Sequence, residues 1–465
     1  MTNYHYVNPS PAESSISLKE LAKRIAEAGN DLVALSACVQ ELSSLPHSGA
    51  AEKLAGEVRS ALQREMNLAL PASYPMTSEE TSRWRQLVSA WRALAQAHIR
   101  WMGVGSRNGT AAAMDALSCL RQIVLLCGVT HWPVPEGLWL DVHGIYNAGL
   151  ESDSAGKRLR RPYLRHHSRT TIEWEYLQTI LLGVTDSWSQ LPQELMALES
   201  MAEKWVSMVK IGTDLRPGWY IDRYADRPAK WCPSGEGVSL DFTELLEFLD
   251  GHRELASPVG RFEWVDQPDD TLSIALLDHW RRIWTENSDC VDDHLEIDQA
   301  ELEVGLNAIF DRCQTRLSSG AVIFTAESNW CKVEGHSLQI GDLLAVFEPA
   351  GNQIERLAVV CRIRCNGGDI PDLRLQIRTI EGQTIPVGVQ PLYRGARPCD
   401  YQRGLLIDAQ GTSRLILAWQ PFRKGIIVRL LSGNEIYPVR LLSRENFARG
   451  LLSCVCESAA SRFQK

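Results

Sequence analysis

Two arginines four residues apart, Arg312 and Arg316, are the residues of this sequence whose type and spacing best suit binding chemistry. Residues four apart on a helix share one face. Two guanidinium groups on one face can donate paired hydrogen bonds to phosphate oxygens, or to the O6 and N7 atoms of guanine. The alternative is a basic helix C-terminus, where positive charge is favourable against the helix dipole. The pattern alone leaves both interpretations open.

The sequence patterns of several enzyme classes are absent. There is no P-loop, no HExxH metal site and no GxSxG nucleophile turn. The run GVGSRNG at 103–109 has GxGxxxG spacing and follows a helical pattern, so we interpret it as a turn between helices and not as a dinucleotide-binding loop. The twelve cysteines form no CxxC pair and no zinc spacing. These patterns nominate no catalytic residues, although they do not exclude an enzyme, and we expect neither a metal nor a cofactor.

The net charge of −9 is unevenly distributed over the 465 residues. Residues 301–465 hold 20 Lys and Arg against 16 Asp and Glu, whereas the remainder holds 28 against 41. Proteins that bind DNA or RNA are usually more basic, so no nucleic-acid partner is expected. The sequence has neither a run of about 18 uncharged apolar residues nor a secretory signal pattern at its N-terminus. These features predict a cytoplasmic protein without a membrane span.

The first half of the sequence has helical periodicity. The pattern is clearest in WRQLVSAWRALAQAHIRW, residues 84–101, where Trp84, Leu87, Trp91 and Leu94 form one apolar stripe. His98 continues the stripe and is expected at the edge of the core and not as a metal ligand. Further helices are expected at 18–44, 49–69, 110–127, 136–149, 172–183 and 191–210.

These patterns predict a helical domain over residues 16–212, after a disordered tail at 1–15. Tryptophan and arginine contribute much of the binding energy at protein interfaces. The sequence contains 15 tryptophans, so we expect the helical half to contact a protein partner that the sequence does not identify.

A basic segment, GKRLRRPYLRHHSR, interrupts the helices. Gly156 and Pro162 break any helix there. Its cations can attract phosphates or an acidic partner, but charge runs are usually solvated, so we favour a solvated connection. The basic residues are Lys157, Arg158, Arg160, Arg161, Arg165 and Arg169.

Residues 213–300 form a mixed connecting segment. A short strand is expected at 219–221, followed by helices near 241–251 and 272–285. The acidic stretch at 286–303 has no DxDxDG loop for calcium, so we interpret it as a linker. It leads into a helix predicted at 301–316.

After Gly320 the pattern becomes that of β-strands. In DLRLQIR, residues 372–378, apolar and polar side chains alternate with a period of two. We predict one barrel over 301–392 and an additional β segment or second small barrel over 393–465. The fold class is α+β and multidomain, with an all-α N-terminal half followed by an antiparallel β-barrel region. Strands are also expected at 321–326, 342–347, 357–364, 385–390, 403–408, 414–419, 425–431 and 436–442.

With these strands, the arginine pair resembles the motif of PilZ domains, bacterial β-barrels that bind cyclic di-GMP. That family has RxxxR before its first strand and [D/N]xSxxG on the following strands. In AESNWC, residues 326–331, Ser328 aligns with the serine, whereas Ala326 and Cys331 replace the acid or amide and the glycine. LQIGDLLAVFEP and LAVVCRIR look like the rest of such a barrel, and HWPVPEGLWLDVHGIYNAG looks like the helical region of a longer bacterial group.

The resemblance implies a cytoplasmic bacterial regulator that responds to cyclic di-GMP and is not itself an enzyme. Arg312 and Arg316 would hold guanine edges and phosphates, and Ser328 would donate to a phosphate. The changes in the serine motif imply a degenerate barrel, because Cys331 and Trp330 would crowd the approach of the backbone to guanine. Two hypotheses follow: a regulator that binds cyclic di-GMP, and a scaffold or adaptor without a small ligand.

Overall fold

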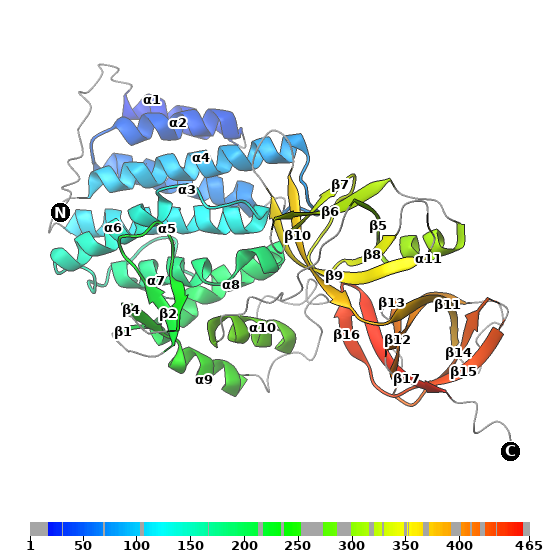
Figure 1. The fold of residues 1–465 in the computed structure, drawn as a ribbon. Coiled ribbons are helices and arrows are strands. Elements are labelled where there is room, and N and C mark those ends of the chain that lie inside the picture. The colour runs from blue at the N-terminus through cyan, green and yellow to red at the C-terminus, as the bar shows by residue number, and fades with distance from the viewer. Residues whose placement is uncertain are drawn as a thin grey trace.

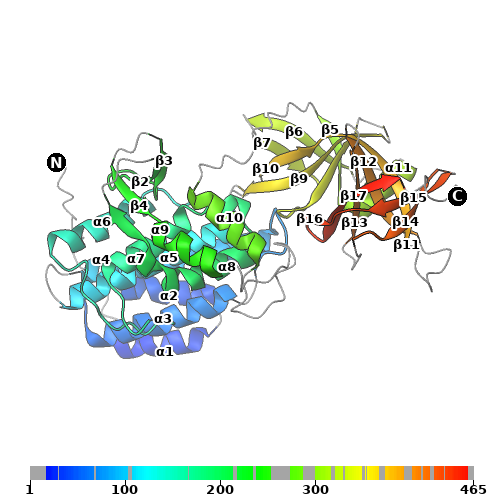
Figure 2. The ribbon, with the colours of Figure 1, turned by 90° about the horizontal axis from the view of Figure 1, so that it is seen from below.

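The structure is a computed structural model with two lobes (Figures 1 and 2). The N-terminal helices occupy one lobe, and the strands of the C-terminal half occupy the other. The predicted fold class, α+β with a helical N-terminal half, is therefore confirmed. The described residues are 17–458 apart from 30, 68–69, 103–106, 166, 213–216, 234–236, 253–272, 286–298, 316–319, 328–329, 348–350, 352, 366–371, 392–400, 410–411, 419–423 and 434.

The helical domain is built around α5. Its neighbours α4, α6, α7 and α8 cover it, and α1, α2 and α3 add a further layer on the side of α4 (Figure 1). The expected disordered tail at 1–15 lies outside the described residues. The helices are α1 (Leu18–Ala28), α2 (Leu32–Ser44), α3 (Gly49–Asn67), α4 (Ser78–Trp101), α5 (Arg107–Thr130), α6 (Leu138–Glu151), α7 (Ile172–Gly183) and α8 (Pro192–Trp205), with 3-10 turns η1 (Ser187–Ser189) and η2 (Val206–Met208).

The single helix predicted over 18–44 is divided into α1 and α2. Gly29 has a φ of 51°, a left-handed conformation that glycine adopts without steric cost and that ends α1. Asp31 then caps α2, since its carboxylate accepts hydrogen bonds from the backbone N–H of Val33 (2.9 Å) and Ala34 (3.1 Å). Of the turn predicted at 103–109, residues 103–106 lie outside the described part, and residues 107–109 form the first turn of α5.

Within α5, the stretch Gly109–Thr130 is long and apolar enough to cross a membrane. All of its most apolar window is buried among the other helices, as in the central helix of a globular domain. Two charged residues, Asp115 and Arg121, lie within this buried helix. They are the starting point of the polar network described below.

The connecting segment contains more sheet than the one strand predicted. Its four strands form an antiparallel sheet in the order β1-β4-β2-β3, flanked by two helices. Aromatic rings join it to the helical domain, because Trp284 of α10 stacks on Phe242 (5.8 Å between centroids) and contacts Trp205 of α8. The elements are β1 (Lys210–Gly212), β2 (Gly218–Ile221), β3 (Lys230–Cys232), β4 (Val238–Asp241), α9 (Thr243–His252) and α10 (Ile274–Thr285).

The first barrel closes in the order β10-β7-β6-β5-β8-β9. The helix predicted at 301–316 is wrong in its first turn, because Ala300–Val304 is strand β5, which pairs with both β6 and β8. Gly305, with φ 83°, separates β5 from α11 (Leu306–Thr315). The expected linker at 286–303 lies mostly outside the described residues. The other strands are β6 (Ala321–Glu327), β7 (Trp330–Glu334), β8 (Leu343–Phe347), β9 (Ile354–Cys365) and β10 (Leu373–Ile380).

A second sheet has the order β13-β12-β11-β14-β15-β17-β16, and pairing of β13 with β17 closes it. It begins at Gln383 and not after 392, because β11 pairs with β12 and β14. Gly382 makes the turn between the barrels, where a Cβ would lie 2.7 Å from Ile407 and 2.8 Å from the Asp408 carbonyl. The strands are β11 (Gln383–Pro391), β12 (Gln402–Ala409), β13 (Thr412–Ala418), β14 (Ile427–Ser432), β15 (Glu435–Leu441), β16 (Glu445–Ala448) and β17 (Leu451–Ser458).

Candidate functional site

Arg312 lies in the last turn of α11, and its side chain is only 2% exposed. Its guanidinium pairs with the carboxylate of Glu301 on β5 and donates from Nε to the carbonyl of Gly351 (3.2 Å). The same group lies 5.4 Å from the ring centroid of Phe347 on β8. The position of Arg312 agrees with both interpretations of the sequence. It lies at a helix C-terminus, and it is also held at the end of a barrel by a partly exposed acid.

Arg316 and Ser328 lie outside the described residues, so their side chains are not placed. Because β6 and β8 both run antiparallel to β5, the C-terminal ends of β6 and β8 lie at the same end of the barrel. Gly351, which follows β8 and accepts from Arg312, places the Arg312 guanidinium at that end. Of the three predicted site residues, the structure therefore places Arg312 alone.

The position of the arginine pair in the barrel differs from the resemblance. RxxxR was expected before the first strand, but α11 follows β5 and precedes β6. The opening strand of the barrel therefore comes before the helix that carries Arg312. The expectation that the motif precedes the barrel is wrong in this chain.

The start of β7 is close to the helical domain. Trp330, the first residue of β7, packs edge-on against Trp188 of η1, with centroids 5.9 Å apart. The guanidinium of Arg364 on β9 lies over the Trp188 ring, 5.2 Å from the ring centroid. Arg362 pairs with Asp186 at 2.8 Å, immediately before η1. The outer face of β7 and β9 is thus attached to one short turn of the helical domain.

Backbone hydrogen bonds reinforce this junction between the lobes. Tyr74 and Leu338 exchange two N–H···O bonds of 2.8 and 2.7 Å, and Cys365 donates to the carbonyl of His131 (3.0 Å). Apolar side chains of the helical domain and of the first barrel interior form one continuous cluster, whereas the second barrel has a separate core. The first barrel is therefore packed on the helical domain as a unit.

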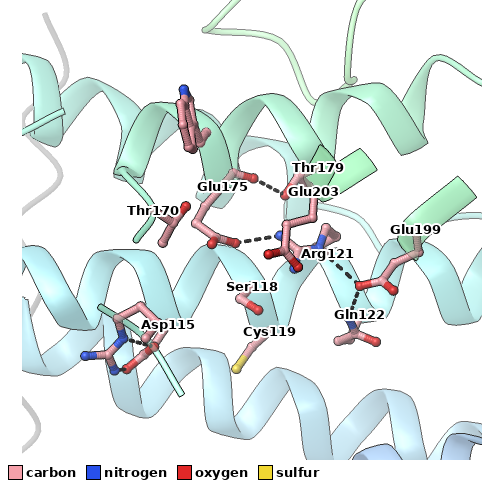
Figure 3. Close-up of polar contacts among 12 residues, drawn as sticks. Asp115, Ser118, Cys119, Arg121, Gln122, Thr170, Glu175, Thr179, Glu199 and Glu203 are labelled. Carbon is pink, nitrogen blue, oxygen red and sulfur yellow. Dashed lines mark hydrogen bonds and ion pairs between the residues drawn. The ribbon is translucent and has the colours of Figure 1, made fainter. Parts of the chain in front are cut away.

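A second polar region lies inside the helical domain (Figure 3). Arg121 of α5 extends between α7 and α8, where it donates to Glu175 (2.5 Å) and lies 3.7 Å from Glu199. Glu199 also accepts from Gln122 (3.2 Å). Burial raises the pKa of Glu175, while the neighbouring Arg121 opposes this shift. Such charges inside a protein require partners, so the network ties α5, α7 and α8 together.

The basic loop, residues 157–169, is part of this region and not simply a solvated connection. Arg161 is 11% exposed; it donates from Nε to Asp115 of α5 (2.9 Å) and lies 3.4 Å from Glu52 of α3. Arg165 remains half-exposed, but its backbone N–H donates to Glu203 of α8 (3.0 Å). The prediction of a solvated loop is therefore wrong for Arg161, because a carboxylate in the buried helix provides its partner.

His98 lies where the sequence predicted, at the edge of the core. It is 2% exposed, its ring packs on Trp101 (5.2 Å), and Nδ1 lies 3.9 Å from Asp115. Burial, with Arg59 and Arg161 nearby, holds the pKa of His98 well below its usual value, so the ring is neutral. Sequence reasoning missed the surrounding network. The available signal was a pair of charges, Asp115 and Arg121, inside a long and predominantly apolar helical segment.

Comparison with known proteins matches the helical half. Residues 16–216 match the family model described as "Cyclic-di-GMP receptor FimW, N-terminal domain". A curated relative, the cyclic-di-GMP receptor FimW of Pseudomonas aeruginosa, is 27% identical over 113 residues, which cover 23% of this chain and 19% of the relative. The chain thus spans about a fifth of the length of the curated relative that it matches. No solved structure matches. The helical domain is similar in sequence to the N-terminal domain of a cyclic-di-GMP receptor.

Proposed function

We propose that this protein is a regulatory protein that responds to cyclic di-GMP and is not itself an enzyme. The observation that carries the proposal is the match of residues 16–216 to the N-terminal domain of a cyclic-di-GMP receptor. The β-barrel packed against that domain is the proposed nucleotide-binding module, with PilZ-like character. The cytoplasmic location of the protein, which is expected from the sequence, stays a prediction.

The proposed ligand site is the end of the first barrel. Arg312 is held there by Glu301, whose side chain is 27% exposed and can turn toward water. A phosphate of the nucleotide would replace that carboxylate as the partner of Arg312, because the guanidinium fork fits both anions. Arg316, four residues later, and Ser328, in the turn after β6, would complete the contacts. The internal ion pair is then the resting state of the site.

Binding at this end has a short route to the helical domain. Ser328 is two residues before Trp330, which contacts Trp188 of η1. A ligand bound by Ser328 would shift the indole of Trp330 against Trp188, a small local displacement of the kind that regulatory proteins amplify. The Arg362–Asp186 ion pair ties β9 to the residue immediately before η1. The helical domain would respond through η1.

The second candidate function is a scaffold or adaptor that contacts a protein partner through its helical half and binds no nucleotide. The observation that favours it is the internal use of Arg312, which is buried and already paired with Glu301. The substitutions Ala326 and Cys331 in the serine motif favour it as well. In this function, the arginine would stabilise the end of α11 and have no ligand.

Calorimetric titration of the full chain with cyclic di-GMP separates the two functions. The test variant is Arg312→Ala/Arg316→Ala, and the matched control is Arg414→Ala/Arg429→Ala, which removes the same charge from exposed positions of the second barrel. We expect micromolar binding by the wild type and the control, and at least tenfold weaker binding by the test variant.

Arg316→Ala alone guards against misfolding, because it leaves the buried Arg312 pair intact. A thermal melt of each variant reports whether the fold is preserved. Absence of binding heat from the wild type at high micromolar nucleotide would contradict the receptor function. It would leave the scaffold as the conclusion, and partners of the helical half would then be the object of study.

A further inference from the structure

We propose that the groove between α3 and the basic loop of the helical domain binds a phosphate ester, at a site separate from the barrel. The inference is independent of the function proposed for the barrel. It rests on the residues that line this groove, on the charges that the protein leaves without a counter-ion, and on a buried donor without an acceptor.

Four arginines from three elements surround one pocket of about 330 Å³. Arg59 and Arg64 come from α3, Arg121 from α5 and Arg165 from the basic loop. The remaining lining is mostly serine, asparagine and glutamine, whose side chains donate and accept hydrogen bonds. A polar pocket with several guanidinium groups is suited to an anion with several oxygens.

The protein itself uses both carboxylates of this pocket. Glu199 accepts from Gln122 (3.2 Å) and lies 3.8 Å from Arg165, and Glu203 accepts from the backbone N–H groups of Arg165 and His167 (3.0 and 2.9 Å). Four cations therefore face two carboxylates, and both carboxylates are already engaged.

Arg59 and Arg64 carry the uncompensated positive charge. Arg59 donates to the hydroxyl of Ser118 (2.8 Å) and to the carbonyl of Asp115 (3.0 Å), which are neutral acceptors. Within the described part of the chain, neither Arg59 nor Arg64 forms an ion pair with a carboxylate within 4 Å. A guanidinium that is bonded only to neutral groups retains its full charge for a ligand.

The second observation is a buried donor. Arg121 is 5% exposed, and Nη1 is bonded to Glu175. Its Nε–H makes no hydrogen bond to any described residue, because Glu199 Oε1 lies 3.7 Å away, within ion-pair range but too far for a hydrogen bond. A buried donor without an acceptor is unfavourable, and native proteins rarely leave one. Since Arg121 lines the pocket, a ligand oxygen there would supply the acceptor.

The adjoining space explains why an ester is proposed and not phosphate alone. A second pocket, of about 730 Å³, shares Arg59, Arg64 and Tyr163 with the first. The guanidinium of Arg59 lies 4.3 Å from the centroid of the Tyr163 ring, at the boundary between the two spaces. Pockets of this size hold small organic molecules. The phosphate would occupy the arginine-rich part, and the organic group would extend past Tyr163.

The test uses the full chain with three probes: inorganic pyrophosphate, guanosine monophosphate and glycerol 3-phosphate. Affinity is measured by calorimetry for the wild type, for Arg64→Ala/Arg165→Ala, and for Arg158→Ala/Arg160→Ala. The last variant removes two charges from exposed positions of the basic loop that do not line the pocket, so it controls for long-range electrostatics. Arg64 and Arg165 are themselves exposed or half-exposed, so their loss should leave the fold intact.

We expect at least one ester to bind more tightly than pyrophosphate, with affinity at least tenfold weaker in Arg64→Ala/Arg165→Ala and unchanged in the control. Three results would overturn the proposal: no binding of any probe at millimolar concentration, equal affinity in both variants, or binding of pyrophosphate without either ester. Repeating the titration with Arg312→Ala/Arg316→Ala removes the barrel site, so failure of one site leaves the conclusion about the other unaffected.

Discussion

Two arginines that are buried in the described part of the chain, Arg121 and Arg312, form the same kind of ion pair in different surroundings. Arg121 pairs with Glu175, which is fully buried, and has Glu199 as a second acid nearby. Arg312 pairs with Glu301, whose side chain is 27% exposed. The pair in the helical core is closed to solvent on both sides, whereas the barrel pair has one partner that can reach water. Only the second kind can exchange its acid for a ligand at small cost.

The largest effect is expected for Arg121→Met. Removing the cation leaves Glu175 buried and without its main partner, which costs about 3–5 kcal/mol of unfolding free energy. Urea denaturation followed by tryptophan fluorescence measures this loss, because most of the tryptophans whose environment is described lie in the helical half and the connecting sheet. Arg121→Met/Glu175→Met is the control, and it should recover much of the stability. If Arg121→Met were as stable as the wild type, the Arg121–Glu175 pair would not contribute to the free energy of unfolding.

Lowering the pH should destabilise the helical half next most strongly, through His131. This residue is fully buried against Tyr74, and burial lowers its pKa to about 3. The unfolded chain protonates it near pH 6.5, so the stability that depends on a neutral ring is complete above that value. It is lost as the pH falls toward 3, by about 2 kcal/mol between pH 7 and pH 5.

Comparison of urea midpoints at pH 7 and pH 5 checks the role of His131. The control is His131→Asn, because asparagine tolerates the left-handed backbone of this position, where φ is 54°. His98 and His143 also have lowered pKa values, so the variant should keep part of the pH dependence. An unchanged loss in His131→Asn would assign the effect to those two histidines.

The sequence predicted the elements of the helical half well, because apolar residues recur at helical spacing through long segments such as 84–101. It failed where pairing partners are distant. Strand β5 is only five residues long and contains Glu301 and Glu303, so it looked like the start of a helix. Its identity is determined by β6 and β8, on either side of it in the barrel.

The same limit applies to the candidate sites. Arg312 was found from the local RxxxR spacing, but its partner Glu301 was not. Arg161 was assigned to a solvated loop because its partner, Asp115, lies 46 residues away in an apolar helix. A local sequence pattern shows that charged residues lie within an apolar helix, but it does not show which residues of opposite charge pair with them. Tertiary structure is needed to show which cation meets them.

A smaller effect is expected for Arg312→Met, at about 1–2 kcal/mol. Glu301 can turn into solvent when its partner is lost, so the penalty is mainly the lost hydrogen bonds to Glu301 and Gly351. Thermal unfolding of Arg312→Met beside Arg121→Met measures the difference directly. Glu301→Gln is the matched variant and should lose less. If Arg312→Met were as damaging as Arg121→Met, the barrel pair would be structural, and its replacement by a ligand would be excluded.

The smallest effect concerns the junction that joins the two regions. Asp186 and Arg362 are 19% and 13% exposed and lie 2.8 Å apart, so their coupling should be about 1 kcal/mol. A double-mutant cycle of Asp186→Asn and Arg362→Met measures it. The pair Lys332–Glu334, also 2.8 Å apart but more exposed, is the reference and should couple by less than half as much.

Equal coupling in both pairs would mean that the Asp186–Arg362 ion pair does not hold the lobes together. The Trp188–Trp330 contact would then be the main connection between barrel and helices, and Trp330→Ala should loosen the junction more than either charge variant.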